Sequence, residues 1–230
     1  MASLVVILQS ITLLATVIGS RSGGCDGGMK KVILSLALGT FGLGMAEFGI
    51  MGVLTELAHN VGISIPAAGH MISYYALGVV VGAPIIALFS SRYSLKHILL
   101  FLVALCVIGN AMFTLSSSYL MLAIGRLVSG FPHGAFFGVG AIVLSKIIKP
   151  GKVTAAVAGM VSGMTVANLL GIPLGTYLSQ EFSWRYTFLL IAIFNIAVMA
   201  SVYFWCRIFA TRRKENYANN FIFYAALPRG

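Results

Sequence analysis

Three side chains in this sequence could carry protons or charge within a nonpolar environment: Glu47, Arg126 and His133. Each stands in a long apolar run, where a charged group costs from about 3 to more than ~10 kcal/mol and usually faces a polar cavity. Carboxyl and imidazole groups can bind and release protons, whereas an arginine stays charged. The pattern therefore predicts proton exchange, or binding of an anionic or hydroxyl-rich ligand, at membrane depth.

Each of these residues also has a simpler structural interpretation. Glu47 is the candidate for proton coupling, but a neutral carboxyl could instead make a packing hydrogen bond. Arg126 could bind a ligand, pair with Glu47 if their helices meet, or extend its long stem to the outer interface. His133 follows two helical turns later, as a packed residue or a proton relay. Tyr74 and Asn168 could line a polar cavity or bond to backbone carbonyls.

The sequence shows no signature of a nucleotide site, a metal site or an enzyme. It contains no Gly-rich loop that ends in Gly-Lys-Ser/Thr and no paired histidines at ligand spacing. The three cysteines are too few for a disulfide framework. We therefore expect no cofactor, and any transport must use an ion gradient or run downhill.

Composition places the chain in a lipid bilayer. Of its 230 residues, 59% are hydrophobic and 9% are charged, whereas soluble domains carry about 25% charged residues. The mean hydropathy of +0.99 would leave too much apolar surface in water. The net charge of +10 does not indicate nucleic-acid binding, because the basic residues form short clusters between apolar runs.

Six apolar runs are long enough to cross the hydrocarbon core as helices, which takes about 20 residues each. They do not alternate polar and apolar residues as barrel strands do. The sequence predicts an all-α membrane protein with six transmembrane helices near 32–54, 69–90, 98–117, 120–144, 153–178 and 186–206.

Basic residues occur before the first run, in alternate loops and after the last run, whereas the other loops hold almost none. This pattern predicts that both termini lie in the cytoplasm. Residues 1–28 include a 15-residue apolar segment, too short for an ordinary span, and we interpret them as an extension or an additional anchor. Residues 29–206 form the six-helix unit, and residues 207–230 a basic cytoplasmic tail.

Small residues recur at four-residue spacing and predict close helix packing, because membrane helices associate through backbone contact. The longest ridge lies in the fifth run, where Pro173 also predicts a kink. We expect this helix to press against a partner along its whole length. The residues assigned to packing and gating are Gly159, Gly163, Gly171, Pro173, Gly175, Gly82, Arg92 and Lys96.

From Met29 to about Trp205 the chain resembles the major facilitator superfamily, drug:proton antiporter-1 type. The resemblance rests on the order of several motifs: Ala46–Phe48, Gly125–Leu127 with Gly130, Gly163 with Gly171–Gly175, and Trp184–Phe188. The resemblance implies a proton-transfer role for Arg126. The loop at 91–97 departs from the family, because Ser91 stands beside Arg92 where an acidic residue is usual.

The resemblance implies the N-terminal half-bundle of a twelve-helix transporter, built as a 3+3 inverted repeat with its substrate site between two halves. The implied activity is proton-coupled efflux of sugars, arabinose-like compounds or drugs from a bacterium, across its inner membrane. The second half would be another six-helix unit or a second copy of this chain. The resemblance also implies that the small-residue ridges of the second and fifth helices face that half, so this chain alone would leave them without a partner. The alternatives are an inactive truncated remnant or a membrane protein that only binds a partner.

Overall fold

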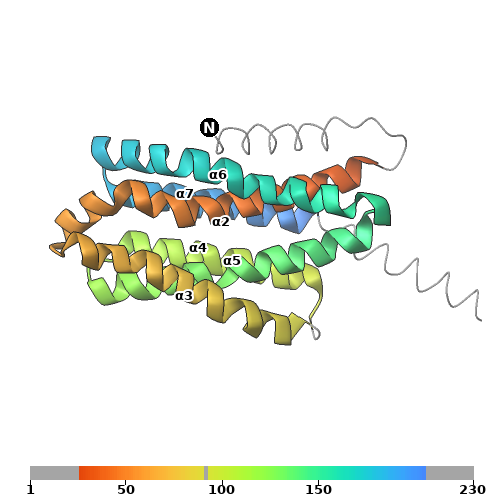
Figure 1. Ribbon diagram of the computed structural model, residues 1–230, viewed down its shortest axis with the longest axis horizontal. Helices are drawn as coiled ribbons and strands as arrows, with labels where there is room; N and C mark the ends of the chain where they lie inside the picture. The colour runs from red at the N-terminus through yellow and green to blue at the C-terminus, as the bar shows by residue number, and fades with distance from the viewer. Residues whose placement is uncertain (1–25, 91–92, 206–230) are drawn as a thin grey trace, which may run out of the picture.

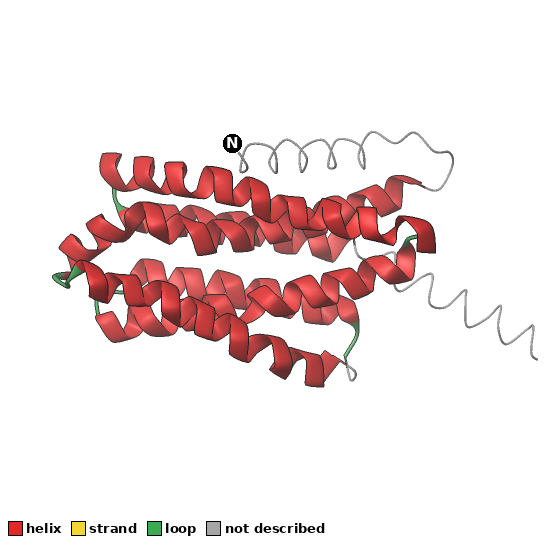
Figure 2. Cartoon of the chain, viewed as in Figure 1, coloured by secondary structure: helices red, strands yellow, loops and turns green. Residues whose placement is uncertain are grey.

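The computed structural model describes residues 26–90 and 93–205, and all regular structure in these ranges is helical (Figure 2). Six long helices are joined by short turns, with one 3-10 turn, η1 (Pro150–Lys152). Every long helix is long and apolar enough to cross a membrane. The six are α2 (Asp26–Val61), α3 (Ile65–Ser90), α4 (Leu95–Leu115), α5 (Tyr119–Ile147), α6 (Val153–Glu181) and α7 (Trp184–Trp205).

The predicted spans agree with these helices to within four residues, except at the ends of α2. That helix starts six residues before and ends seven residues after the predicted 32–54. Its last turns carry exposed polar residues, and the Asn60 amide donates to the carbonyl oxygen of Glu56. A 36-residue helix is about 54 Å long, so α2 extends beyond the hydrocarbon. Residues 1–25, Arg92 and the tail 207–230 lie outside the described residues.

Local sequence explains where the chain turns. Gly62 closes the end of α2 with φ of +71°, a conformation that a residue without Cβ adopts readily. Ser94 and Ser118 cap α4 and α5, because their hydroxyl oxygens accept from the backbone N–H groups of His97 and Met121. Three prolines lie within helices, Pro84 in α3, Pro132 in α5 and Pro173 in α6.

The helices form two groups that lie side by side along the long axis (Figure 1). One group contains α2, α6 and α7, and the other contains α3, α4 and α5. The closest pairs are α2 with α6 and α3 with α5, and α4 joins the groups through α7. If α2–α4 and α5–α7 are two copies of a three-helix repeat, α2 corresponds to α5 and α3 corresponds to α6. The pair α2–α6 then corresponds to the pair α5–α3, so the two close pairs are equivalent, as such a repeat requires.

Glycines make both close pairs possible. A Cβ on Gly163 of α6 would collide with the Ala37 carbonyl oxygen of α2, and one on Gly175 would lie 2.7 Å from the Gly49 carbonyl oxygen. On α3, a Cβ on Gly82 would collide with the Phe131 carbonyl oxygen of α5. The backbones therefore touch at these points.

These contacts correct one prediction. The expectation that the glycine ridge of α6 lacks its partner within this chain is wrong, because α2 occupies that ridge along its length. The opposite faces of α3 and α6 are the exposed ones. Residues such as Val80 on α3 and Tyr177 on α6 are 70% and 59% exposed.

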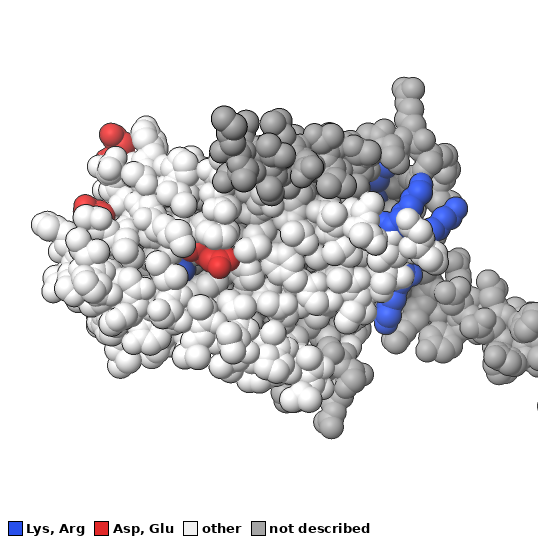
Figure 3. All heavy atoms as spheres, viewed as in Figure 1, with Lys and Arg blue, Asp and Glu red and all other residues white. Residues whose placement is uncertain are grey.

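Charge is divided between the two ends of the bundle. Figure 3 shows most of the visible Lys and Arg side chains at one end, acidic side chains at the other, and about midway a further acidic group with a few basic atoms beside it. Three lysines mark the junction of α5, η1 and α6: Lys146, Lys149 and Lys152. Apart from this group and the atoms beside it, the described surface between the two ends carries no charged side chain on this face, as contact with lipid tails requires.

Candidate functional site

The site is built from four side chains on three helices: Glu47 of α2, Tyr75 of α3, and Arg126 and His133 of α5. Arg126 and His133 are seven residues apart, so they lie two turns apart on one face of α5. That face turns inward because Gly130, between them, lets the backbone of α5 touch the backbone of α3 at Tyr75. Close packing of α3 on α5 thus places Tyr75 beside both residues.

Glu47 and His133 face each other across the interface of α2 and α5. Glu47 Oε2 lies 3.6 Å from His133 Nε2, which is too long for a hydrogen bond. The side chain of Glu47 is 32% exposed and that of His133 is 7% exposed. Glu47 Oε2 itself is buried and has no hydrogen-bond partner. One part of the carboxyl group is thus accessible, whereas Oε2 is buried against the imidazole.

Arg126 is 1% exposed and is held by backbone and aromatic groups. Its Nη1 donates to the Ala46 carbonyl oxygen at 2.8 Å, and its Nε donates to the Met71 carbonyl oxygen at 3.4 Å. The guanidinium also lies 4.5 Å from the centre of the Tyr75 ring. Nη2 is buried without a partner.

The environment of Arg126 decides between the alternatives left open by the sequence. Extension to the outer interface is wrong, because the side chain is buried. The described ranges show no contact within 4.0 Å between Arg126 and Glu47, and the Glu47 carboxyl group lies instead against His133. Two carbonyl oxygens and the face of an aromatic ring stabilise the cation instead.

Tyr75 connects His133 to α2. Its hydroxyl lies 2.8 Å from His133 Nδ1 and donates to the Leu43 carbonyl oxygen at 3.3 Å. The Tyr75 and His133 rings meet edge to face, and the Phe137 ring stacks on the imidazole. Two aromatic rings therefore pack against His133.

Sequence reasoning missed Tyr75 and named its neighbour Tyr74. The half-buried Tyr74 instead meets Tyr119, with 3.4 Å between the two hydroxyl oxygens. The signal that identifies Tyr75 is the helical register: it precedes Gly78 and Gly82 by three and seven residues. These two glycines contact α5, so Tyr75 shares the face that does.

The other predicted site residues lie away from this cluster. Asn168 is exposed on α6. Gly159 and Gly171 are buried in α6, and Gly171 makes ordinary contact with Phe48 of α2. Lys96, at the start of α4, places its Nζ 4.4 Å from the centre of the Tyr203 ring of α7.

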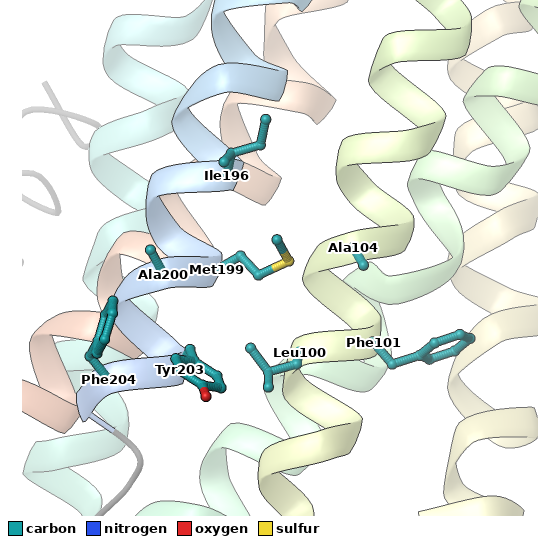
Figure 4. A pocket seen from close by; sticks show the side chains of 8 residues that line it. All are labelled: Leu100, Phe101, Ala104, Ile196, Met199, Ala200, Tyr203 and Phe204. Carbon is teal, nitrogen blue, oxygen red and sulfur yellow. The ribbon is translucent and has the colours of Figure 1, made fainter.

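A separate hollow lies between α4 and α7 (Figure 4). It has a volume of about 530 Å³ and is lined by apolar residues, including Leu100 and Met199, whose side chains point into the space between the two helices. A polar ligand would find almost no hydrogen-bonding group there. We therefore assign the candidate site to the cluster at Glu47 and His133.

The cluster is suited to holding and releasing a proton. A carboxyl and an imidazole face each other, a buried cation lies nearby, and part of the carboxyl group remains accessible. In a bundle whose surroundings are apolar, such a pair can exchange a proton through the accessible part of the Glu47 carboxyl group.

Known structures and sequences agree with this architecture. The crystal structure of a D-xylose-proton symporter aligns over 84% of this chain and 53% of its own, with a TM-score of 0.67 and 15% identity. That likeness concerns the fold.

Two relatives from Escherichia coli K12 are closer in sequence. "Putative transporter AraJ" is 92% identical over 195 residues, which are 85% of this chain and 50% of the relative. The "Inner membrane transport protein YdhP" is 41% identical over 75% of this chain and 44% of its own length. The chain thus spans about half the length of these relatives. Residues 36–223 match the Major Facilitator Superfamily, and the chain belongs to this family of membrane transporters, which are not enzymes.

Proposed function

We propose that this chain supplies the N-terminal half of a proton-coupled transporter, with Glu47 as the residue that carries the proton. The supporting observation is the position of its carboxyl group. It lies in the middle of α2, is partly accessible, and directs a buried, unpartnered oxygen toward His133. A protonated carboxyl can cross a nonpolar barrier at much lower cost than a carboxylate, which is the property that coupling to a proton gradient needs.

The proposed cargo is a small polar molecule such as a sugar or an arabinose-like compound, moved outward, with a drug-like molecule as the second choice. This assignment follows from the family resemblance. Arg126 acts in the proposal as a fixed charge beside the proton-carrying residue, because its environment keeps it buried and hydrogen-bonded. Proton-coupled movement then alternates between protonated and ionised Glu47, while Arg126 keeps its charge.

We also propose the orientation. The end with Lys146, Lys149 and Lys152 faces the cytoplasm of a bacterial cell, because basic loops remain on the cytoplasmic side. The membrane is the inner membrane.

The exposed faces of α3 and α6 are the proposed contact with a second six-helix half. That half is a separate polypeptide, a second copy of this chain, or the remainder of a longer protein. The glycine faces of the same helices are already filled by α5 and α2. The contact with the other half must therefore use the larger exposed side chains, such as Leu77 and Leu169.

Transport by paired halves tests the proposal. The chain is co-expressed with the C-terminal half of AraJ, and uptake of labelled L-arabinose into inverted membrane vesicles is measured with an imposed proton gradient. Glu47→Gln should abolish gradient-driven accumulation, because glutamine cannot exchange the proton. Glu56→Gln is the matched control on the same helix, since Glu56 bonds to Asn60 at the outer end. Normal accumulation by Glu47→Gln would contradict the proposal.

A second candidate function is that of a membrane protein that binds a partner but transports nothing, or of an inactive remnant. The observation in its favour is the set of large exposed side chains on α3 and α6, such as Leu77 and Leu169, which a partner could cover. Rapid degradation in the membrane, with no accumulation of substrate in the presence of either AraJ half, would favour this candidate.

A further inference from the structure

The hydroxyl group of Tyr75 makes two contacts with a single hydrogen. It lies 3.3 Å from the Leu43 carbonyl oxygen and 2.8 Å from His133 Nδ1. A carbonyl oxygen can only accept, so Tyr75 must donate its hydrogen to Leu43 for that bond to exist. The bond between Tyr75 and His133 then needs its hydrogen from the imidazole. Both bonds form together only if His133 carries its hydrogen on Nδ1.

Burial favours the arrangement in which both contacts are hydrogen bonds. Tyr75 is 1% exposed, and only in this arrangement does its hydroxyl both donate and accept. The imidazole also stacks on the ring of Phe137, with 5.5 Å between ring centres.

The same arrangement determines what Glu47 faces. In a neutral imidazole with hydrogen on Nδ1, the other nitrogen, Nε2, has a free lone pair. Nε2 is the atom that lies 3.6 Å from Glu47 Oε2. Neither a lone pair nor a carboxylate oxygen can donate, so this tautomer gives Oε2 no hydrogen bond from His133 while Glu47 is ionised, in keeping with their separation of 3.6 Å.

We propose that Tyr75 is a positioning residue that fixes His133 in the Nδ1–H tautomer, so that Nε2 is a proton acceptor directed at Glu47. The use of this acceptor rests on the proposed function, in which Glu47 carries the proton. When Glu47 is protonated, its O–H donates to Nε2. If the proton moves, the O–H bond breaks and an N–H bond forms, which leaves a carboxylate beside an imidazolium with unchanged total charge.

Nitrogen NMR tests the tautomer directly. The 230-residue chain is labelled with ¹⁵N-histidine and placed in lipid nanodiscs at neutral pH. Four histidines give signals, and a His133→Gln variant assigns those of His133. The expected result is a protonated Nδ1 and an unprotonated Nε2, which have well-separated shifts. Finding the hydrogen on Nε2, or on both nitrogens, overturns the proposal.

A matched pair of variants tests the role of the hydroxyl. Tyr75→Phe keeps the ring that packs against Arg126 and His133 but removes the oxygen that accepts from Nδ1. We expect the hydrogen of His133 to move to Nε2, where it can donate to Glu47. Tyr74→Phe removes a neighbouring hydroxyl that contacts Tyr119, and it should leave the tautomer unchanged. An unchanged tautomer in Tyr75→Phe also overturns the proposal.

These measurements separate the inference from the proposed function. The NMR spectrum reads the tautomer without any transport. An Nδ1–H tautomer that changes in Tyr75→Phe, together with normal transport by Glu47→Gln, would retain the positioning role of Tyr75 and reject proton carriage by Glu47. A hydrogen on Nε2 of His133, together with loss of transport in Glu47→Gln, would reject the positioning role of Tyr75 and retain proton carriage by Glu47.

Discussion

The close contact of α6 with α2 gives a sharp prediction for Gly163→Ala. The added Cβ would collide with the Ala37 carbonyl oxygen and would lie 2.6 Å from Thr40 Oγ1 and 2.9 Å from the Ala37 carbonyl carbon. Ordinary contact starts at 3.4 Å, so the two helices must separate by about 0.8 Å or more. Backbone atoms cannot avoid the clash by rotating, unlike the end of a flexible side chain.

The magnitude follows from two losses. Overpacking by one methyl group typically costs about 1–3 kcal/mol. Separation also weakens the hydrogen bond of 2.6 Å from Thr40 Oγ1 to the Met160 carbonyl oxygen, and such bonds between membrane helices contribute about 0.6–1.7 kcal/mol. The free energy of unfolding should therefore fall by about 2–4 kcal/mol relative to a control that gains the same methyl group without a clash.

Gly138→Ala is that control, because a Cβ at Gly138 meets nothing within 4 Å. Both variants gain the helix propensity of alanine, about 1 kcal/mol in water, so this contribution cancels. Unfolding by a denaturing detergent can be followed through Cys106, which is fully buried and reacts with a thiol dye after unfolding. Cys25 and Cys206 are first replaced by serine. Equal stability of the two alanine variants, within about 0.5 kcal/mol, would refute the contact between the backbones.

Two further predictions use the same preparation. Arg126→Met should lower the free energy of unfolding by about 2–3 kcal/mol, because it removes hydrogen bonds from a charged group to two buried carbonyl oxygens. The control is Arg185→Met, at a half-buried residue bonded to Ser116, which should lower the free energy of unfolding by less. The reverse order would contradict this account. Light scattering in mild detergent should show a one-to-one complex of the chain with the C-terminal half of AraJ, whereas a chain that stays alone would show that this half does not cover α3 and α6.

The fold could be predicted from sequence because the bilayer leaves few choices. An apolar run of about 20 residues must form a helix to satisfy its backbone groups, so six such runs give six helices. The ends of α2 were harder to predict from the sequence, because its polar last turns continue the helix beyond the hydrocarbon. Hydropathy detects the hydrocarbon boundary and not the end of the helix.

The candidate site was only partly predictable. Glu47, Arg126 and His133 were identifiable because charged or titratable groups are rare in apolar runs. Which of them meet depends on the rotation of α2 relative to α5, and hydropathy carries no information on rotation. Pairing of Glu47 with Arg126 is one alternative that the sequence offers, whereas the structure places His133 beside Glu47. Glycine positions contain the missing information, since Gly78 and Gly82 define the face of α3 that carries Tyr75.

The pairing of early helices with late ones has a consequence for synthesis. Thr40 and Met160, bonded between α2 and α6, are 120 residues apart, and Tyr75 and His133, between α3 and α5, are 58 apart. At 5–20 residues per second, α2 waits about 6–24 s for its partner, and α3 about 3–12 s. The pair α3–α5 can therefore close first at the ribosome. Until α6 emerges, the glycine face of α2 needs a temporary neighbour, either lipid or the insertion machinery.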